Sequence, residues 1–75
     1  MSLSECRARQ RVRILSVGAA AEEALRMHEL GLRHGTVVQV THRGAFGSMV
    51  IAIGGARLAL DGATARAVGV EPLAG

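Results

Sequence analysis

The segment from Leu25 to Val40 constrains the fold more strongly than any other part of the chain. Its sequence, LRMHELGLRHGTVVQV, predicts the end of a short helix, a glycine stop, a tight turn and then a strand over Thr36–His42. Gly31 lies just past the helix, where a left-handed backbone favours glycine. Met27 and Leu32 occupy the two positions that commonly make the apolar contact of a glycine-capped helix end. A helix therefore leads the chain at a fixed angle into a sheet.

The remaining elements are predicted from alternating apolar residues, β-branched runs and glycine turns. They are a helix from Ala19–Ala21 to Leu30, strands over 10–17, 49–53, 57–60 and 67–70, and a single helical turn over 61–66. Gly54-Gly55 is typical of a tight hairpin between two of these strands, and Asp61 is the expected N-cap of the helical turn. The apolar stripe of the first helix is expected to comprise Ala20, Ala24, Met27 and Leu30.

Five short strands, one short α-helix after the first strand and a one-turn helix before the last predict a mainly β fold. We expect a small five-stranded SH3-like barrel that closes on itself, because closure removes exposed strand edges. The 75 residues correspond to a single domain, residues 1–75, near the lower limit for an independent core. The apolar residues are almost all aliphatic, so a partner protein or association into a homo-oligomer is expected to contribute to stability.

The N-terminal sequence and the single cysteine indicate a cellular compartment. No apolar run approaches the ~18 residues of a membrane-spanning helix, and MSLSEC lacks the apolar core of a signal peptide. We therefore expect a cytoplasmic protein without direct membrane insertion. Cys6 has no partner for an internal disulfide, which agrees with a reducing compartment. Leu3 and Cys6 are expected to tuck a short lead-in turn under the domain.

Arginine supplies all of the positive charge, because the chain contains no lysine and has a formal net charge of +3. Arg7, Arg9, Arg11 and Arg13 alternate with other residues, so an early start of the first strand would place all four on one face. One interpretation is a positive stripe, centred on Arg11 and Arg13, that meets an acidic protein partner. The other is a solvated strand face whose like charges discourage edge-to-edge pairing.

Phe46, the only aromatic residue, lies in the loop RGAFGS between two predicted strands. One interpretation is a small partner-binding anchor formed by an exposed Phe46 and the flexible Met49. The other is a phenylalanine that plugs one end of the barrel. A nucleic-acid partner is not expected, because a single aromatic residue provides no stacking platform.

Metal ligands and catalytic groups are sparse. His28, Glu29, His34 and His42 are the weak candidates for metal ligands, and Cys6 is remote from them in sequence. Their spacing lacks the clustered ligands of a structural zinc site, which favours solvent-facing histidines. The alternative is transition metal ion binding, as an adventitious or inter-subunit Zn or Ni site through His34 or His42. We infer no iron site, no cofactor and, in the absence of a nucleophile with a matched base, no enzyme.

Several segments resemble, in order and spacing, the FeoA family of small cytosolic proteins encoded beside the ferrous iron permease FeoB. The residues that carry this resemblance are RMHELGL from Arg26, Gly35-Thr36, RGAFG from Arg43, Gly55 with Leu58-Ala59-Leu60, and Ala65 with Val68-Gly69-Val70. Arg9 stands where the family usually has a turn glycine.

The resemblance implies a non-enzymatic accessory protein of bacterial ferrous iron uptake. Such a protein would bind the cytoplasmic part of the FeoB permease, which includes a guanine-nucleotide-binding domain, and modulate its assembly or activity. One alternative is a regulatory module that binds proline-rich or extended peptides and is related to the C-terminal domain of metal-dependent repressors. A small nucleic-acid-binding barrel is a third, less favoured alternative.

Overall fold

The computed structural model of the protein describes the backbone of residues 1–18 and 21–73 and the side chains of residues 1–18 and 24–73. These described residues form five strands, two α-helices and two 3₁₀ turns. In chain order these are η1 (Leu3–Glu5), β1 (Arg11–Val17), α1 (Ala21–Glu29), β2 (Val37–Arg43), η2 (Ala45–Gly47), β3 (Met49–Ile53), β4 (Ala56–Leu60), α2 (Gly62–Ala67) and β5 (Val68–Pro72). The predicted order of elements is confirmed.

All five strands belong to one antiparallel sheet with the order β4-β3-β2-β1-β5. The mainly β, SH3-like fold is confirmed, but the expected closure is wrong. In the described residues, β4 and β5 form the two ends of the sheet and are not paired with each other. The short helix α2 connects them instead, so the sheet curves without closing.

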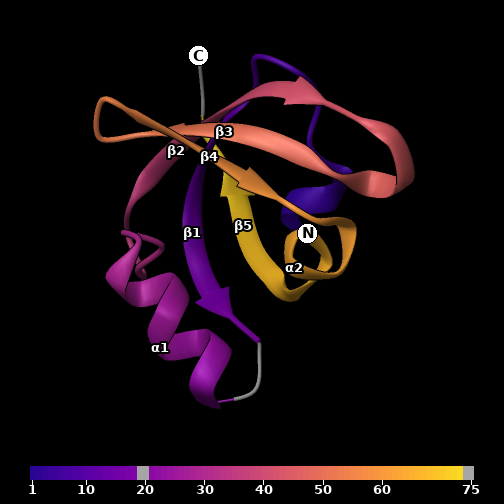
Figure 1. Cartoon of the computed structure of the whole chain (residues 1–75). Coiled ribbons are helices and arrows are strands. Elements are labelled where there is room, and N and C mark those ends of the chain that lie inside the picture. Colours follow the sequence, from indigo (N-terminus) through magenta and orange to yellow (C-terminus); the bar gives the residue numbers. More distant parts are fainter. Residues whose placement is uncertain (19–20, 74–75) are drawn as a thin grey trace.

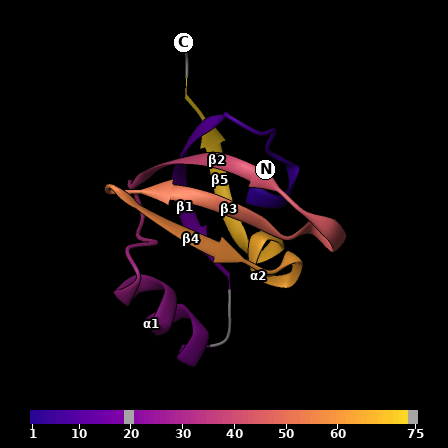
Figure 2. The ribbon, with the colours of Figure 1, turned by 45° about the horizontal axis from the view of Figure 1, so that its top comes forward.

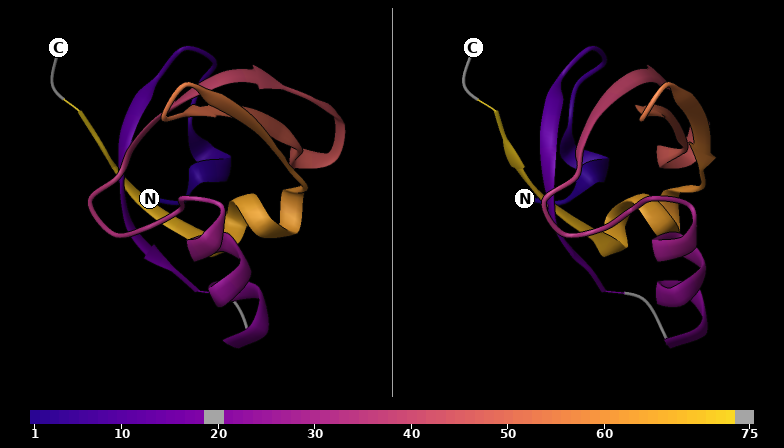
Figure 3. Two further views of the ribbon diagram at one scale, coloured as in Figure 1. Left: turned by 60° about the vertical axis from the view of Figure 1, so that its left-hand side comes forward. Right: turned by 90° about the vertical axis from the view of Figure 1, so that its left-hand side faces the viewer.

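Figures 1 and 2 show β2, β3 and β4 passing across β1 and β5 in a strongly curved sheet. Register shifts in the β1–β5 pair, between Ile14 and Ser16, and in the β2–β3 pair, between Val40 and His42, accompany this curvature. Such bulges increase local twist and bend a strand. Figure 3 shows α1 projecting away from the sheet at one end of the molecule.

The glycine-capped end of α1 is confirmed in detail. Gly31 has a φ of +102°, its N–H donates to the carbonyl of His28 (3.0 Å), and the N–H of Leu32 donates to the carbonyl of Met27 (2.9 Å). This pair of bonds defines a Schellman motif. Met27 and Leu32 are both buried, as the apolar contact of this motif requires. The motif fixes the direction in which the chain leaves the helix.

The core lies inside the curve of the sheet and is built from alternate residues of the strands. Its members are Leu3, Cys6, Val12, Ile14, Met27, Leu32, Val38, Val40, Met49, Ile51, Leu60, Ala65, Val68 and Val70. The burial of Leu3 and Cys6 confirms the predicted lead-in turn. Leu30, expected in the inward stripe, is instead 51% exposed, while Ala20 lies outside the described residues. Among the described side chains of α1, Met27 is the one that belongs to the core.

Candidate functional site

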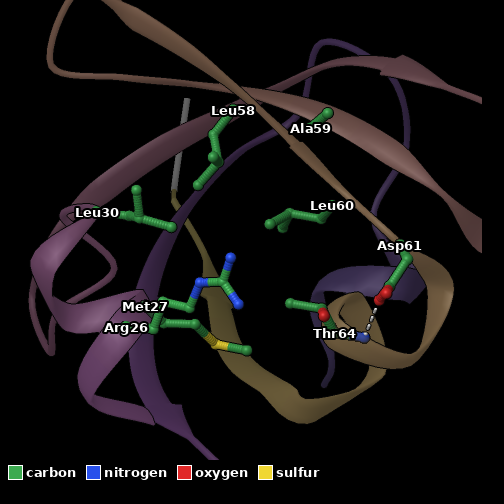
Figure 4. Close-up of a pocket in the computed structure, with 8 residues that line it drawn as sticks. All are labelled: Arg26, Met27, Leu30, Leu58, Ala59, Leu60, Asp61 and Thr64. Carbon is green, nitrogen blue, oxygen red and sulfur yellow. Dashed lines mark hydrogen bonds between the residues drawn. The ribbon is translucent and has the colours of Figure 1, made fainter. Parts of the chain in front are cut away.

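A groove of about 380 Å³ lies between α1, β4 and the beginning of α2 (Figure 4). Its lining comprises Arg26, Met27 and Leu30 from α1 and its C-terminal end, Leu58, Ala59 and Leu60 from β4, and Asp61 and Thr64. The groove is therefore formed by segments about thirty residues apart in the sequence.

The apolar walls of the groove follow from local geometry. Met27 and Leu30 are three residues apart at the end of α1, so both face the same side. Leu58 and Leu60 are two residues apart on β4 and likewise share one face. Leu60 is buried and Leu58 is half-buried, whereas half of the Leu30 side chain remains exposed. The groove thus has an apolar floor and an apolar rim that is open to solvent.

The glycine that ends α1 lies close to the β3–β4 hairpin. A Cβ atom added at Gly31 would lie 3.2 Å from Cδ1 of Ile53, the last residue before the hairpin turn. The C-terminal end of α1 therefore lies next to the last side chain of β3.

Two charged side chains line the groove at different places. The guanidinium of Arg26 points into its middle, and the carboxylate of Asp61 lies at its α2 end (Figure 4). Asp61 is the predicted N-cap of α2, and its carboxylate accepts a hydrogen bond from the N–H of Thr64 at 2.7 Å. This bond, with a smaller contribution from the charge of Arg66, lowers the pKa of Asp61 below its usual value. The carboxylate of Asp61 therefore stays ionised and acts as the N-cap of α2.

The outer edge of β4 carries backbone groups without a neighbouring strand in the described part of the chain. In an antiparallel strand, alternate residues direct their N–H and C=O groups away from the paired neighbour. Ala59, which lines the groove, belongs to this edge strand. The groove is consequently bordered by hydrogen-bonding groups that an added extended segment can use.

The predicted row of four arginines is broken in the structure. The first strand begins at Arg11, and Arg9 precedes it in a turn with a φ of +73°. That turn is closed by a bond from the N–H of Gln10 to the carbonyl of Arg7 (3.1 Å). Only Arg11 and Arg13 share the exposed face of β1, and Arg13 Nη1 pairs with Glu71 Oε1 at 3.1 Å. The expected stripe therefore shortens to two residues, one of them in an ion pair.

Phe46 is 97% exposed, so the interpretation that it plugs the barrel is wrong. It has a left-handed backbone, with φ +58° and ψ +29°, which is uncommon for a bulky residue. The turn that holds it includes bonds from both the N–H (3.1 Å) and the Oγ (2.7 Å) of Ser48 to the carbonyl of Ala45. Backbone packing of Gly62 against the Phe46 carbonyl leaves no room for a Cβ. The Phe46 ring is therefore exposed on a turn whose backbone is held by hydrogen bonds and by packing against Gly62.

Met49 does not accompany Phe46 on the surface, and that part of the prediction is wrong. Met49 is only 2% exposed and belongs to the core. It is the first residue of β3, and with Ile51 it lies on the inward face of that strand. Strand alternation, rather than proximity in sequence to the loop, decides its direction.

The weak metal-ligand candidates His28, Glu29, His34 and His42 are all exposed. In residues 1–18 and 24–73, no three His, Cys, Asp or Glu side chains gather as a metal site would require. Cys6 is buried, and this burial raises the pKa of its thiol.

The groove itself is not predicted by any pattern in the sequence. Leu30 and Leu58 stood out only as members of an apolar stripe and a strand, and Arg26 only as part of the family resemblance. Helical and strand spacing could identify each wall separately. Their juxtaposition carried no sequence signal.

Comparison with known proteins gives a consistent result. Residues 1–72 match the model of the FeoA domain family. The structure of FeoA from Chlorobium tepidum superimposes with a TM-score of 0.91 at 30% identity, over 100% of this chain and 72% of that one. FeoA from Stenotrophomonas maltophilia, a prokaryotic SH3 domain protein solved with zinc, superimposes with a TM-score of 0.81 at 30% identity, over 95% of this chain and 89% of that one.

A further FeoA crystal structure, described as an iron uptake regulatory protein, superimposes with a TM-score of 0.85 at 25% identity, over 96% of this chain and 94% of that one. No curated protein matches the chain in sequence. Within the described ranges, none of the helices has the length and apolar character needed to cross a bilayer. With its family model matched over almost its whole length, the chain belongs to the FeoA family.

Proposed function

We propose that this protein is a non-enzymatic, cytoplasmic accessory factor that binds the cytoplasmic part of the FeoB permease and modulates its assembly or activity. Membership of the FeoA family supports a role in ferrous iron transport. A role as an activating factor of that transport has been suggested for the protein from Stenotrophomonas maltophilia. The single observation that carries the proposal is the groove between α1 and β4, which we propose as the docking site for a segment of the permease.

The composition of the groove favours binding to a protein segment. Leu30 and Leu58 expose apolar surface at a concave site, which is the arrangement that buries an apolar anchor of a partner. The polar groups lining the groove are a guanidinium, a hydroxyl and a carboxylate that caps α2. These groups suit the positioning of a bound chain, since none is arranged as a nucleophile with its base.

The test is an NMR amide-shift titration of the labelled protein with the purified cytoplasmic portion of FeoB from the same organism, with and without guanine nucleotide. We expect shifts at residues lining the groove. Leu30→Gln should weaken binding about tenfold, because it removes an apolar contact near the centre of the interface.

The matched control is Leu25→Gln on the same helix. Leu25 is 60% exposed but does not line the groove, so its substitution should leave the affinity unchanged. Equal losses for both variants, or shifts confined to surfaces away from the groove, would contradict the proposed docking site.

Phe46, Arg11 and Arg13 are proposed as additional contacts with the permease. Phe46→Ser and the charge reversal of Arg11 and Arg13 should each weaken binding less than Leu30→Gln does. Unchanged affinity in the charge-reversed variant would remove this pair of arginines from the interface.

The free edge of β4 also favours a second candidate function, a regulatory module that binds extended peptides by strand addition. This candidate predicts binding to proline-rich or extended peptides and no response to the permease. A peptide arm in the same titration separates the two functions.

A further inference from the structure

We infer that Arg26 makes the groove selective for a carboxylate placed beside a leucine-sized apolar side chain. The partner segment would then be acidic as well as apolar. This inference rests on the proposed function for the identity of the partner, but it concerns the chemistry of the groove alone.

The geometry places a cation beside apolar side chains in a groove whose lining is mixed polar and apolar. Arg26 projects from α1, and its guanidinium lies in the groove that Leu60 and Thr64 also line (Figure 4). Met27, Leu30 and Leu58 provide apolar lining around it. Arg26 is an exposed residue, so its charge remains accessible to a ligand that enters the groove from solvent.

The guanidinium group has a strong chemical preference among ligands. It is always charged, and its planar fork of N–H donors matches a carboxylate in a bidentate arrangement. A carboxylate bound beside leucine side chains would also be partly shielded from water, which strengthens its interaction with the cation. An uncharged carbonyl in the same place would gain a weaker hydrogen bond.

The groove also defines where the carboxylate must sit. Among the described side chains, Asp61 is the only carboxylate that lines the groove; it lies at the α2 end and is bonded to the N–H of Thr64. Its negative charge disfavours a second carboxylate at that end. The acidic group of the ligand is therefore directed toward Arg26 on the α1 side.

The occupant that fits these constraints is an extended, acidic and apolar segment of the cytoplasmic part of the permease. Its backbone would pair with the free edge of β4, and its leucine-sized side chain would contact Leu30 and Leu58. An acidic side chain of the segment would reach Arg26. The net positive charge of the protein complements such a segment during encounter.

The experiment uses two small probes that differ only in charge, N-acetyl-leucine and N-acetyl-leucinamide. Each is titrated into the labelled full-length protein, and amide and arginine side-chain shifts are followed. We expect both probes to shift Leu30, Leu58 and Leu60, with the carboxylate probe binding about fivefold more tightly. Only the carboxylate probe should shift the Arg26 side-chain signal.

Arg26→Gln should abolish the difference between the two probes while leaving the weaker binding of the amide intact. The matched control is Arg57→Gln, which removes the same charge from an exposed position on β4 that does not line the groove. This control should keep the fivefold preference. An equal loss in both variants would overturn the inference in favour of general attraction to net positive charge.

Equal affinity of the two probes for the unaltered protein would also overturn the inference, as would the absence of groove shifts at probe concentrations of tens of millimolar. The proposed function fails separately. If the probes discriminate as expected but the cytoplasmic portion of FeoB causes no groove shifts, then carboxylate selectivity stands and the permease is not its target.

Discussion

The two edges of the sheet differ in whether other residues of the chain cover them. The N-terminal residues cover the edge at β5: the N–H of Val70 donates to the carbonyl of Met1 (2.9 Å), and Ser2 forms a bridge with Gly69. Leu3 and Cys6 are fully buried beneath this cover. The edge at β4 has no such cover in the described residues, and the groove borders it.

This difference shows how a small domain divides its apolar residues between stability and binding. A strand edge left open invites pairing with other chains, so proteins cover or blunt most such edges. The chain uses its first residues for one edge, and Arg43 reinforces that cover by donating from Nη1 to the Cys6 carbonyl (2.6 Å). The other edge keeps half-exposed leucines beside a cation, which is the composition of a recognition surface.

The largest expected effect is the difference in free energy of unfolding between leucine-to-alanine variants at the two edges. Leu3→Ala should lower the free energy of unfolding by about 3 kcal/mol, because it removes a fully buried side chain and leaves a cavity. Leu30→Ala should cost less than about 1 kcal/mol, because half of that side chain is already exposed. Urea unfolding of both variants measures the difference. Similar losses would show that the two edges contribute equally to the core and would break the comparison.

A second prediction concerns α2, which connects the two edges and contacts both η1 and η2. Gly62→Ala should lower the free energy of unfolding by about 2 kcal/mol, since the new Cβ would collide with the backbone carbonyl of Phe46. Thermal unfolding measures the loss, and amide shifts should concentrate in η2 and α2. Ala63→Ser, at the exposed neighbouring position, is the control and should have little effect. A stable Gly62→Ala variant with an unchanged Phe46 amide signal would contradict the close packing of these turns.

The smallest effect is expected from the ion pair that joins β1 to the covered strand β5. Arg13 and Glu71 are both half-exposed, so their coupling should contribute only about 0.5 kcal/mol and should weaken as salt is added. A double-mutant cycle of Arg13→Ala and Glu71→Ala measures this coupling. Arg11→Ala, on the same exposed face of β1, provides the comparison. A coupling well above 1 kcal/mol would mean that the covered edge depends on charge as well as on buried leucine.

Local sequence patterns were sufficient for the order of the strands and α-helices and for three of their turns and ends, whereas β5 extends to Pro72 beyond the predicted strand over 67–70. Gly31 determined the Schellman end of α1, Gly54-Gly55 the β3–β4 hairpin, and Asp61 the cap of α2. These features depend on hydrogen bonds and steric limits among residues a few positions apart.

Only the tertiary structure decided which edge remains open and what lies beside it. Leu30 became a groove wall instead of a core residue because its surroundings depend on β4, which is distant in sequence. Met49 turned inward and Phe46 outward because the phase of β3 and the support from Gly62 set their directions. The sequence by itself determined the elements and the glycine-capped helix end, whereas contacts between remote segments created the groove and placed Arg26 in it. Local periodicity specifies which residues share a face, but not which remote segment that face will meet.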